Sequence, residues 1–269
     1  EIQPDSSRGD LSKGFIVPRG TMMDSLALKK TGVTCSYTTA HEVNLLPLKI
    51  ERIELGGVPA DLPLAQLGLS QRGISSALRI RIACDGPQHL GHLDFDRLEF
   101  FLSGPDIEAL KLLELVMEHH AGIVCQTVSK QPQRQLLSSD ALRQEGFDAD
   151  QALLPDDLRN FDGYRLLQEY FAFPARFRFI SLSGLGKLIQ RCEDEKAFHI
   201  FVLLDKSDDQ LERVVEASHM ALHCTPVINL FPKVAARQKL SESQHEYHLV
   251  VDNIRPLDYE IYAVKKIYA

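Results

Sequence analysis

The chain has 269 residues, of which 44% are hydrophobic and 25% charged, the balance of an ordinary soluble globular protein. Its formal net charge of −7 lacks the basic excess with which nucleic-acid-binding proteins neutralise phosphates, so we expect no nucleic-acid partner. Its apolar runs are much shorter than the roughly 20 residues of a membrane-spanning helix, so we expect no direct insertion into a membrane.

Residues 1–130 are predicted to form a β-rich module with one helix. Strands are expected within residues 15–21 and 33–55, and again at 93–102 and 122–128. The clearest is "ALRIRIAC", in which apolar and basic residues alternate as in a half-buried antiparallel strand. This alternation places Leu78, Ile80, Ile82 and Cys84 on one face and Arg79 and Arg81 on the other.

The helix of this module is expected to begin after Ser103, whose hydroxyl can cap it. Pro105 suits the first turn, and Asp106 suits the positive end of the helix. Apolar residues then recur at three- and four-residue spacing, which predicts a buried stripe. The stripe consists of Ile107, Leu110, Leu113 and Met117.

Residues 131–162 are polar and poorly periodic. Long structureless connections are uncommon inside compact domains, so we interpret this segment as the connection between two modules, with one short helix at 139–146. The predicted fold class is α+β and β-rich, with largely antiparallel sheets, a few amphipathic helices and two modules. The second module is expected to span residues 163–269.

The second module opens with "GYRLLQEYFAFPARFRFISL", which is rich in aromatic and arginine residues. Its first half has helical spacing, Pro174 ends that pattern, and a strand is expected to follow. In that strand Phe177 and Phe179 would share one face and the arginines the other, whereas a single-strand stacking platform needs rings and cations together. At this junction we expect either core contacts or interface anchors: Tyr164, Tyr170, Phe171, Phe173, Arg176 and Arg178.

Further elements are predicted toward the C-terminus. A strand is expected at 198–206, followed by a helix that a Ser207–Gln210 capping box starts and that buries Leu211, Val214 and Val215. Three more strands are expected, at 219–231, 246–251 and 259–268.

Catalytic and metal-binding patterns are weak. The five cysteines are scattered in apolar segments without a CxxC pair, which indicates reduced core thiols in a cytoplasmic protein. His219 and His223 could share a metal on a helix with Cys224 as a third ligand, or Cys224 could act as a nucleophile, but no HExxH motif or second ligand pair accompanies them. We therefore expect no enzyme and no cofactor, and keep as the alternative a cytoplasmic hydrolase that uses Cys224 or a His219/His223 metal site.

Several segments resemble one protein family. "GYRLLQEYFAFPARFRFISLSGL", preceded by "DADQALLPDD" and followed by "CTPVINLF", is similar to the TssF family, also called VasA or ImpG. That family is a baseplate subunit of the type VI secretion system. Because its members are longer at both ends, and because this chain has no starting Met, we expect an internal section of a longer protein.

The resemblance implies a structural role and no catalytic residues. It implies a baseplate wedge in which two copies of the protein join one TssG-like subunit. It further implies contacts with TssK, TssE and the spike hub, in support of the contractile tail. Such an assembly would lie in the cytoplasm, at the cytoplasmic side of the inner membrane.

Overall fold

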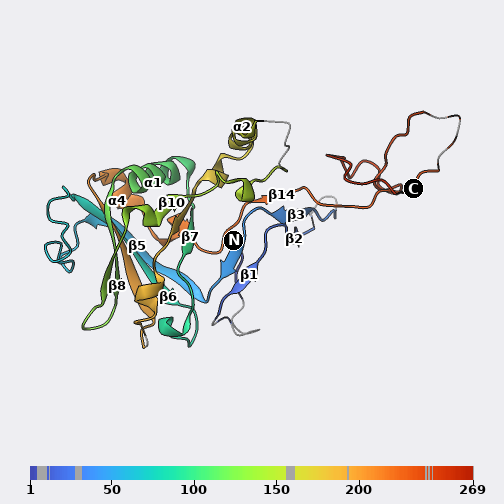
Figure 1. Cartoon of the computed structure of the whole chain (residues 1–269). Helices are drawn as coiled ribbons and strands as arrows, with labels where there is room; N and C mark the ends of the chain where they lie inside the picture. The colour runs from blue at the N-terminus through green and yellow to red at the C-terminus, as the bar shows by residue number, and fades with distance from the viewer. Residues whose placement is uncertain are drawn as a thin grey trace. The chain divides into compact units, whose positions relative to one another are not determined.

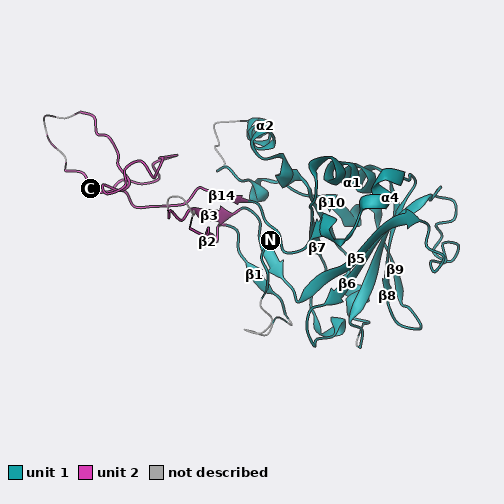
Figure 2. Ribbon diagram, turned by 180° about the vertical axis from the view of Figure 1, so that it is seen from behind, with its two compact units in different colours: residues 1–19, 40–226 teal, residues 20–39, 227–269 magenta. Residues whose placement is uncertain are grey.

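The computed structural model resolves two compact units, which are described separately (Figure 2). Unit 1 comprises residues 1–19 and 40–226, and unit 2 comprises residues 20–39 and 227–269. The structure describes residues 1–4, 11, 13–27, 32–155, 161–192, 194–239, 241, 243 and 245–268. Among these residues, no helix is both long and apolar enough to cross a membrane.

The core of unit 1 is a five-stranded antiparallel sheet with the order β5-β6-β12-β8-β9. The central strand, β12, is buried on both faces, which explains why its sequence "AFHIFVLL" is apolar except for His199. The strands are β5 (Leu48–Gly57), β6 (Ser76–Cys84), β8 (His120–Thr127), β9 (Arg134–Leu137) and β12 (Ala197–Leu204).

The predicted alternation of β6 is confirmed. Its four apolar side chains belong to the main hydrophobic cluster, while Arg79 and Arg81 lie on the other face beside His199 of β12. In β5 the alternation changes phase because the register shifts between Ile50 and Arg52.

A second sheet of unit 1 has the order β10-β11-β7-β13, and β1 pairs with β4 in a two-stranded sheet. All of these pairs are antiparallel. The strands are β1 (Phe15–Val17), β4 (Val43–Leu45), β7 (Leu98–Leu102), β10 (Leu142–Gln144), β11 (Phe179–Leu182) and β13 (Met220–Ala221).

Four α-helices are present in the described residues: α1 (Asp106–Glu118), α2 (Asp162–Ala172), α3 (Gly186–Ile189) and α4 (Asp209–Val214). The 3-10 turns are η1 (Leu90–His92), η2 (Ser139–Ala141), η3 (Ala149–Gln151), η4 (Pro174–Phe177) and η5 (Ala217–His219). Figure 1 shows α1 and α4 on the same side of the large sheet, with α2 standing away from it.

The predicted buried stripe of α1 is wrong. Ile107 and Leu110 are 72% and 53% exposed, and Leu113 and Met117 are only partly buried. The helix instead buries an adjacent face: Ala109, Leu112, Leu115 and Val116. Apolar residues occur on both faces, so spacing alone did not decide which face meets the sheet.

Both predicted serine caps are also wrong. The Ser103 hydroxyl donates to the carbonyl of Ser218 and does not cap α1. At α4 the carboxylate of Asp208, and not Ser207, accepts hydrogen bonds from the amides of Gln210 and Leu211. A carboxylate at this position also favours the positive end of the helix dipole.

The segment expected to connect two modules lies within unit 1. Residues 139–146 form η2 and strand β10 instead of a helix. β12 pairs with strands from the first half of the chain, as does β11. The units separate at 19/20, 39/40 and 226/227 instead.

Unit 2 contains a three-stranded antiparallel sheet with the order β14-β3-β2. Its strands are β2 (Met22–Asp24), β3 (Ser36–Thr39) and β14 (Val227–Ile228). Residues 219–231 hold only β13 and β14, and no strand occurs at 246–251 or 259–268, all of which are described. Those two predictions are wrong, because an extended segment forms a β-strand only where a neighbouring strand pairs with it.

Candidate assembly surface

Helix α2 turns its apolar side outward and its charged side inward. Phe171 is 80% exposed, and Glu169 is the buried residue of this helix. The positions of Tyr164, Leu167 and Phe171 follow i, i+3, i+7 spacing and therefore share one side. The aromatic face, as we call this exposed surface, consists of Phe161, Tyr164, Leu167, Tyr170, Phe171 and Phe173.

A buried ion cluster holds the inward side of α2. The Glu169 carboxylate pairs with the guanidinium of Arg176, and Arg165 lies 3.6 Å from it. The other carboxylate contact is the amide of Leu154, which donates to Glu169 Oε1 at 3.0 Å. Because a buried charge is costly without a partner, this cluster orients α2 with its apolar side toward solvent.

Arg176 is fully buried and joins α2 to the loop before it. Its guanidinium donates to the carbonyls of Gly146, at 2.7 Å, and Gln151, at 3.0 Å. Burial and the nearby charges of Arg165 and Arg19 lower the pKa of Arg176 to about 10, so it stays charged at neutral pH. Gly146 has φ of +103°, and a Cβ there would lie 2.9 Å from the Arg176 carbonyl oxygen, so this approach requires glycine.

The strand predicted from Arg176 onward is a 3-10 turn, η4, and β11 begins only at Phe179. The break at Pro174 is confirmed, and Phe177 and Phe179 are both buried. The two arginines do not share a solvated face: Arg176 is in the ion cluster, and Arg178 pairs with Asp106 at 3.2 Å.

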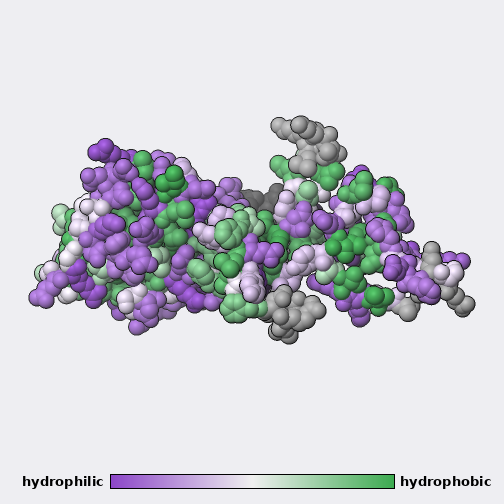
Figure 3. Space-filling model, turned by 90° about the horizontal axis from the view of Figure 1, so that it is seen from above, coloured by the Kyte–Doolittle hydropathy of each residue, from purple (hydrophilic) through white to green (hydrophobic). Residues whose placement is uncertain are grey.

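Ring contacts connect the aromatic face to the interior. Tyr170 lies 5.5 Å from Phe171 and 5.9 Å from the buried Phe177, between ring centroids. The ring of Phe147, which is 48% exposed, also lies 5.2 Å from that of Phe177, between centroids. Viewed from above, hydrophobic residues stand at the surface of unit 1 among hydrophilic ones (Figure 3). The residues predicted at this junction did not include Phe161 or Leu167, although both follow the three-residue spacing of Tyr164.

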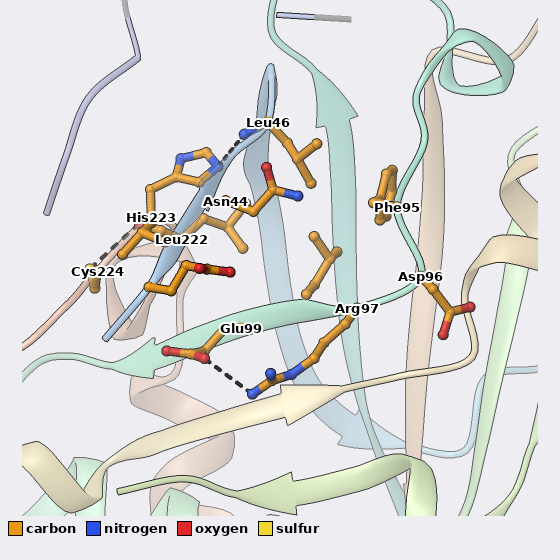
Figure 4. A pocket seen from close by; sticks show the side chains of 12 residues that line it. Asn44, Leu46, Phe95, Asp96, Arg97, Glu99, Leu222, His223 and Cys224 are labelled. Atoms are coloured by element: carbon orange, nitrogen blue, oxygen red, sulfur yellow. Dashed lines mark hydrogen bonds and ion pairs between the residues drawn. The ribbon is translucent and has the colours of Figure 1, made fainter. Parts of the chain in front are cut away.

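A cavity of about 310 Å³ lies near the residues of the alternative, hydrolytic hypothesis. His223 and Cys224 line it together with Arg97 and Glu99 (Figure 4). The His223 Nε2 accepts a hydrogen bond from the amide of Leu46, and the Cys224 thiol faces the carbonyl of Leu222. The imidazole is therefore engaged with backbone and not with the thiol that it would have to activate.

The two histidines of the metal hypothesis have separate partners. His219 Nε2 lies 3.0 Å from a carboxylate oxygen of Glu108, whereas His223 contacts Leu46. In the described residues no group of three or more metal-ligating side chains comes together. His223 also has a φ of 56°, an uncommon backbone conformation outside glycine.

Comparisons with known proteins agree on one family. The family model described as "Type VI secretion system, TssF" matches residues 1–269. This chain belongs to the TssF family. It is 37% identical over 270 residues to the type VI secretion system component TssF1 of Pseudomonas aeruginosa, covering 99% of this chain and 43% of that protein. The TssF resemblance found in the sequence is thus confirmed.

A solved structure shares the fold of this TssF-family chain. The match is to a chain of a TssK-TssF-TssG baseplate subcomplex of the type VI secretion system, with a TM-score of 0.73 and 24% identity. It covers 91% of the present chain and 43% of the other. The chain therefore spans less than half the length of either matched protein.

The cysteines of the TssF-family chain are expected to differ in reactivity. Burial raises the pKa of the Cys125 thiol, and raises that of Cys192 to about 11, so few thiolates form there at neutral pH. Burial also raises the pKa of the Cys224 thiol. Native labelling with iodoacetamide at pH 7.5, followed by mass spectrometry, should modify the partly exposed Cys35 first. Faster labelling of Cys224 would instead favour the nucleophile hypothesis.

Stability is expected to fall below pH 6.5 through His199. Burial, with Arg79 and Arg81 beside the ring, lowers the pKa of His199 to about 4, and this outweighs the opposing effect of Asp61 and Glu51. The unfolded chain therefore takes up a proton between pH 6.5 and 4 that the folded chain does not, so the free energy of unfolding decreases as pH falls through this range.

Urea denaturation at pH 7 and pH 5 measures this effect. The His199→Gln variant should lose less stability between the two values than the unmodified protein. Some dependence should remain, because burial also lowers the pKa of His223 to about 4. Equal losses in both proteins would show that His199 does not contribute.

Proposed function

We propose that this chain is part of a structural subunit of the type VI secretion baseplate, which assembles with TssG- and TssK-like partners. Membership of the TssF family supports this role. The partners are those named for the structural relative, a TssK-TssF-TssG baseplate subcomplex. In the finer proposal, two copies join one TssG-like subunit in a cytoplasmic wedge. The wedge contacts a TssE-like protein and the spike hub at the inner membrane.

The observation that carries this proposal is the outward aromatic face of α2. Single exposed hydrophobic residues are common on monomers, but a contiguous group marks an interaction site. Tyr and Phe are favoured anchors at protein interfaces. The buried Glu169–Arg176 pair fixes the helix that carries them, as a scaffold requires when it holds a partner in a set orientation.

The candidate residues have distinct roles in this proposal. Tyr164, Phe171 and Phe173 provide contact area, and Tyr170 joins that area to Phe177 in the core. Arg176 and Arg178 act inside the subunit, through Glu169 and Asp106. A hydrolase that uses Cys224 or a His219/His223 metal site is not favoured. His219 contacts Glu108, His223 accepts a hydrogen bond from the Leu46 amide, and the Cys224 thiol faces the Leu222 carbonyl.

Co-expression tests the proposal. The full-length protein, carrying an affinity tag, is produced together with the TssG- and TssK-like proteins of the same organism and purified in two steps. We expect a complex that contains all three proteins in a fixed ratio through size-exclusion chromatography. Elution of the tagged protein alone, with the other two proteins soluble in the same lysate, would contradict the proposed function.

A further inference from the structure

We infer that the aromatic face is a docking helix, which inserts into an apolar groove on a different baseplate subunit. This inference rests on the proposed function and adds to it the site of contact and the chemistry of the partner. The groove should have an uncharged floor and a Lys or Arg at the end that meets Asp162. Neither a second copy of this chain nor a lipid surface fits as well.

The spacing of the exposed residues supports helix-in-groove docking. In this mode an amphipathic helix presents anchors at i, i+3, i+4 and i+7 to a hydrophobic groove. Tyr164, Leu167 and Phe171 occupy the i, i+3 and i+7 positions of α2, and Tyr170 flanks them. The helix has 11 residues, or about three turns, which is enough for three successive anchors.

The area of the aromatic face fits a specific interface. Its six residues are between 42% and 80% exposed. Since a large aromatic side chain buries about 150–250 Å², covering these residues would remove on the order of 700 Å² from water on this side. A standard interface buries about 800 Å² on each partner. The face alone therefore supplies most of one side of a stable interface.

Charge defines the partner further. Within residues 161–174 the charged side chains are Asp162, Arg165 and Glu169. The last two are in the buried cluster, with 9% and 1% of their side chains exposed, whereas that of Asp162 is 61% exposed. A complementary surface thus carries one basic group near the start of α2 and no charge along the rest.

The same charges argue against a membrane. Helices that lie on a lipid surface carry Lys and Arg on an exposed polar side, where these residues attract anionic headgroups. In α2 the charged side faces the protein. Arg165 forms ion pairs with Asp162, at 3.7 Å, and with Glu169, at 3.6 Å. Insertion of the aromatic face would place the exposed Asp162 carboxylate at the lipid surface, while the one cation of residues 161–174, Arg165, is largely buried and cannot reach anionic headgroups.

Pairing of two copies through α2 is disfavoured by shape and charge. Two convex helices touch along a narrow seam, so the outer rings of the aromatic face would stay partly exposed. An antiparallel pair would also bring Asp162 of each copy against residues 170–173 of the other, which hold no basic side chain. A concave partner of a different sequence can cover the outer rings and can also place a basic side chain opposite Asp162.

Photocrosslinking tests the inference in the full-length protein. The photoreactive residue p-benzoylphenylalanine replaces Phe171, the protein is co-expressed with the TssG- and TssK-like proteins, and crosslinked peptides are identified by mass spectrometry. We expect a crosslink to an apolar groove on one of these two proteins. A crosslink to another part of the same full-length chain, to a second copy of it, or to lipid would overturn the inference.

Matched variants give an independent measurement. Leu167→Asp with Phe171→Asp should weaken binding of the crosslinked partner by about 30-fold or more, while Ile107→Asp with Leu110→Asp, at similarly exposed positions of α1, should not. Asp162→Lys should weaken binding more than Asp162→Asn. If a charged pair disturbs folding, as circular dichroism would show, Phe171→Ser alone is compared with Ile107→Ser.

The outcomes separate this inference from the proposed function. Loss of binding in the α2 variants, with the α1 variants unaffected, supports the docking helix. Equal binding by α2 variants and unmodified protein would overturn the docking helix and leave the baseplate role intact. Failure of the unmodified protein to bind either partner would contradict the proposed function itself.

Discussion

Replacing Glu169 by Gln should lower the free energy of unfolding by about 3–5 kcal/mol, the usual cost of removing one partner of a buried ion pair. Arg176 has no exposed surface, so its charge would remain in the interior without a carboxylate. Arg165 would also lose its ion pair with the Glu169 carboxylate. Urea denaturation followed by far-ultraviolet circular dichroism at pH 7 measures the change.

The control is Glu114→Gln, at an exposed position of α1. It makes the same chemical change on a helix surface and should alter stability by no more than about 0.5 kcal/mol. If Glu169→Gln were as stable as this control, the ion cluster would not be what holds α2. Partner binding should also weaken in Glu169→Gln, because the aromatic face loses its fixed orientation.

Phe198→Ala should also cost about 3–5 kcal/mol, the range observed for deleting a buried phenylalanine ring. Phe198 is fully buried in the main cluster, on the central strand β12. It lies opposite Ile82 of β6 and Thr127 of β8. Because these strands form one sheet, their amides should lose hydrogen-exchange protection together.

Phe171→Ala is the matched control, since it deletes the same ring from a position that is 80% exposed. Its stability should stay within about 0.5 kcal/mol of the unmodified protein. If Phe198→Ala reduced protection in β12 while β6 and β8 stayed fully protected, residues 1–130 would fold as a module of their own. That result would favour a boundary at 131–162 over the units observed in the structure.

Strands with strict alternation could be predicted from the sequence, because burial of one face requires a period of two. In β6 the apolar and basic residues separate cleanly, and each set lies where the pattern places it. The sequence did not reveal which face of α1 is buried, since Ile107 and Ala109 head two competing apolar stripes. Only the sheet against which α1 packs selects between them.

The aromatic face of α2 could be predicted only in part, because tertiary contacts also decide which side of this helix is buried. Helical spacing and Pro174 correctly indicated α2 and its end, and drew attention to Tyr170 and Phe171. The local pattern could not show that α2 buries Glu169. Arg176, the ion-pair partner of Glu169, lies beyond the end of the helix and reaches the carboxylate only because the chain turns at Pro174. Which side of an amphipathic helix faces inward depends on such tertiary contacts.

Cryo-electron microscopy of the full-length protein mixed with TssG- and TssK-like proteins would show directly whether the aromatic face of α2 docks onto another subunit. We expect the outward side of α2 to lie in a groove of one of these subunits, with Tyr164 and Phe171 covered and a basic residue close to Asp162. An assembled complex in which the aromatic face of α2 remains open to solvent, or is covered by another part of the same chain, would show that α2 does not dock onto a second subunit.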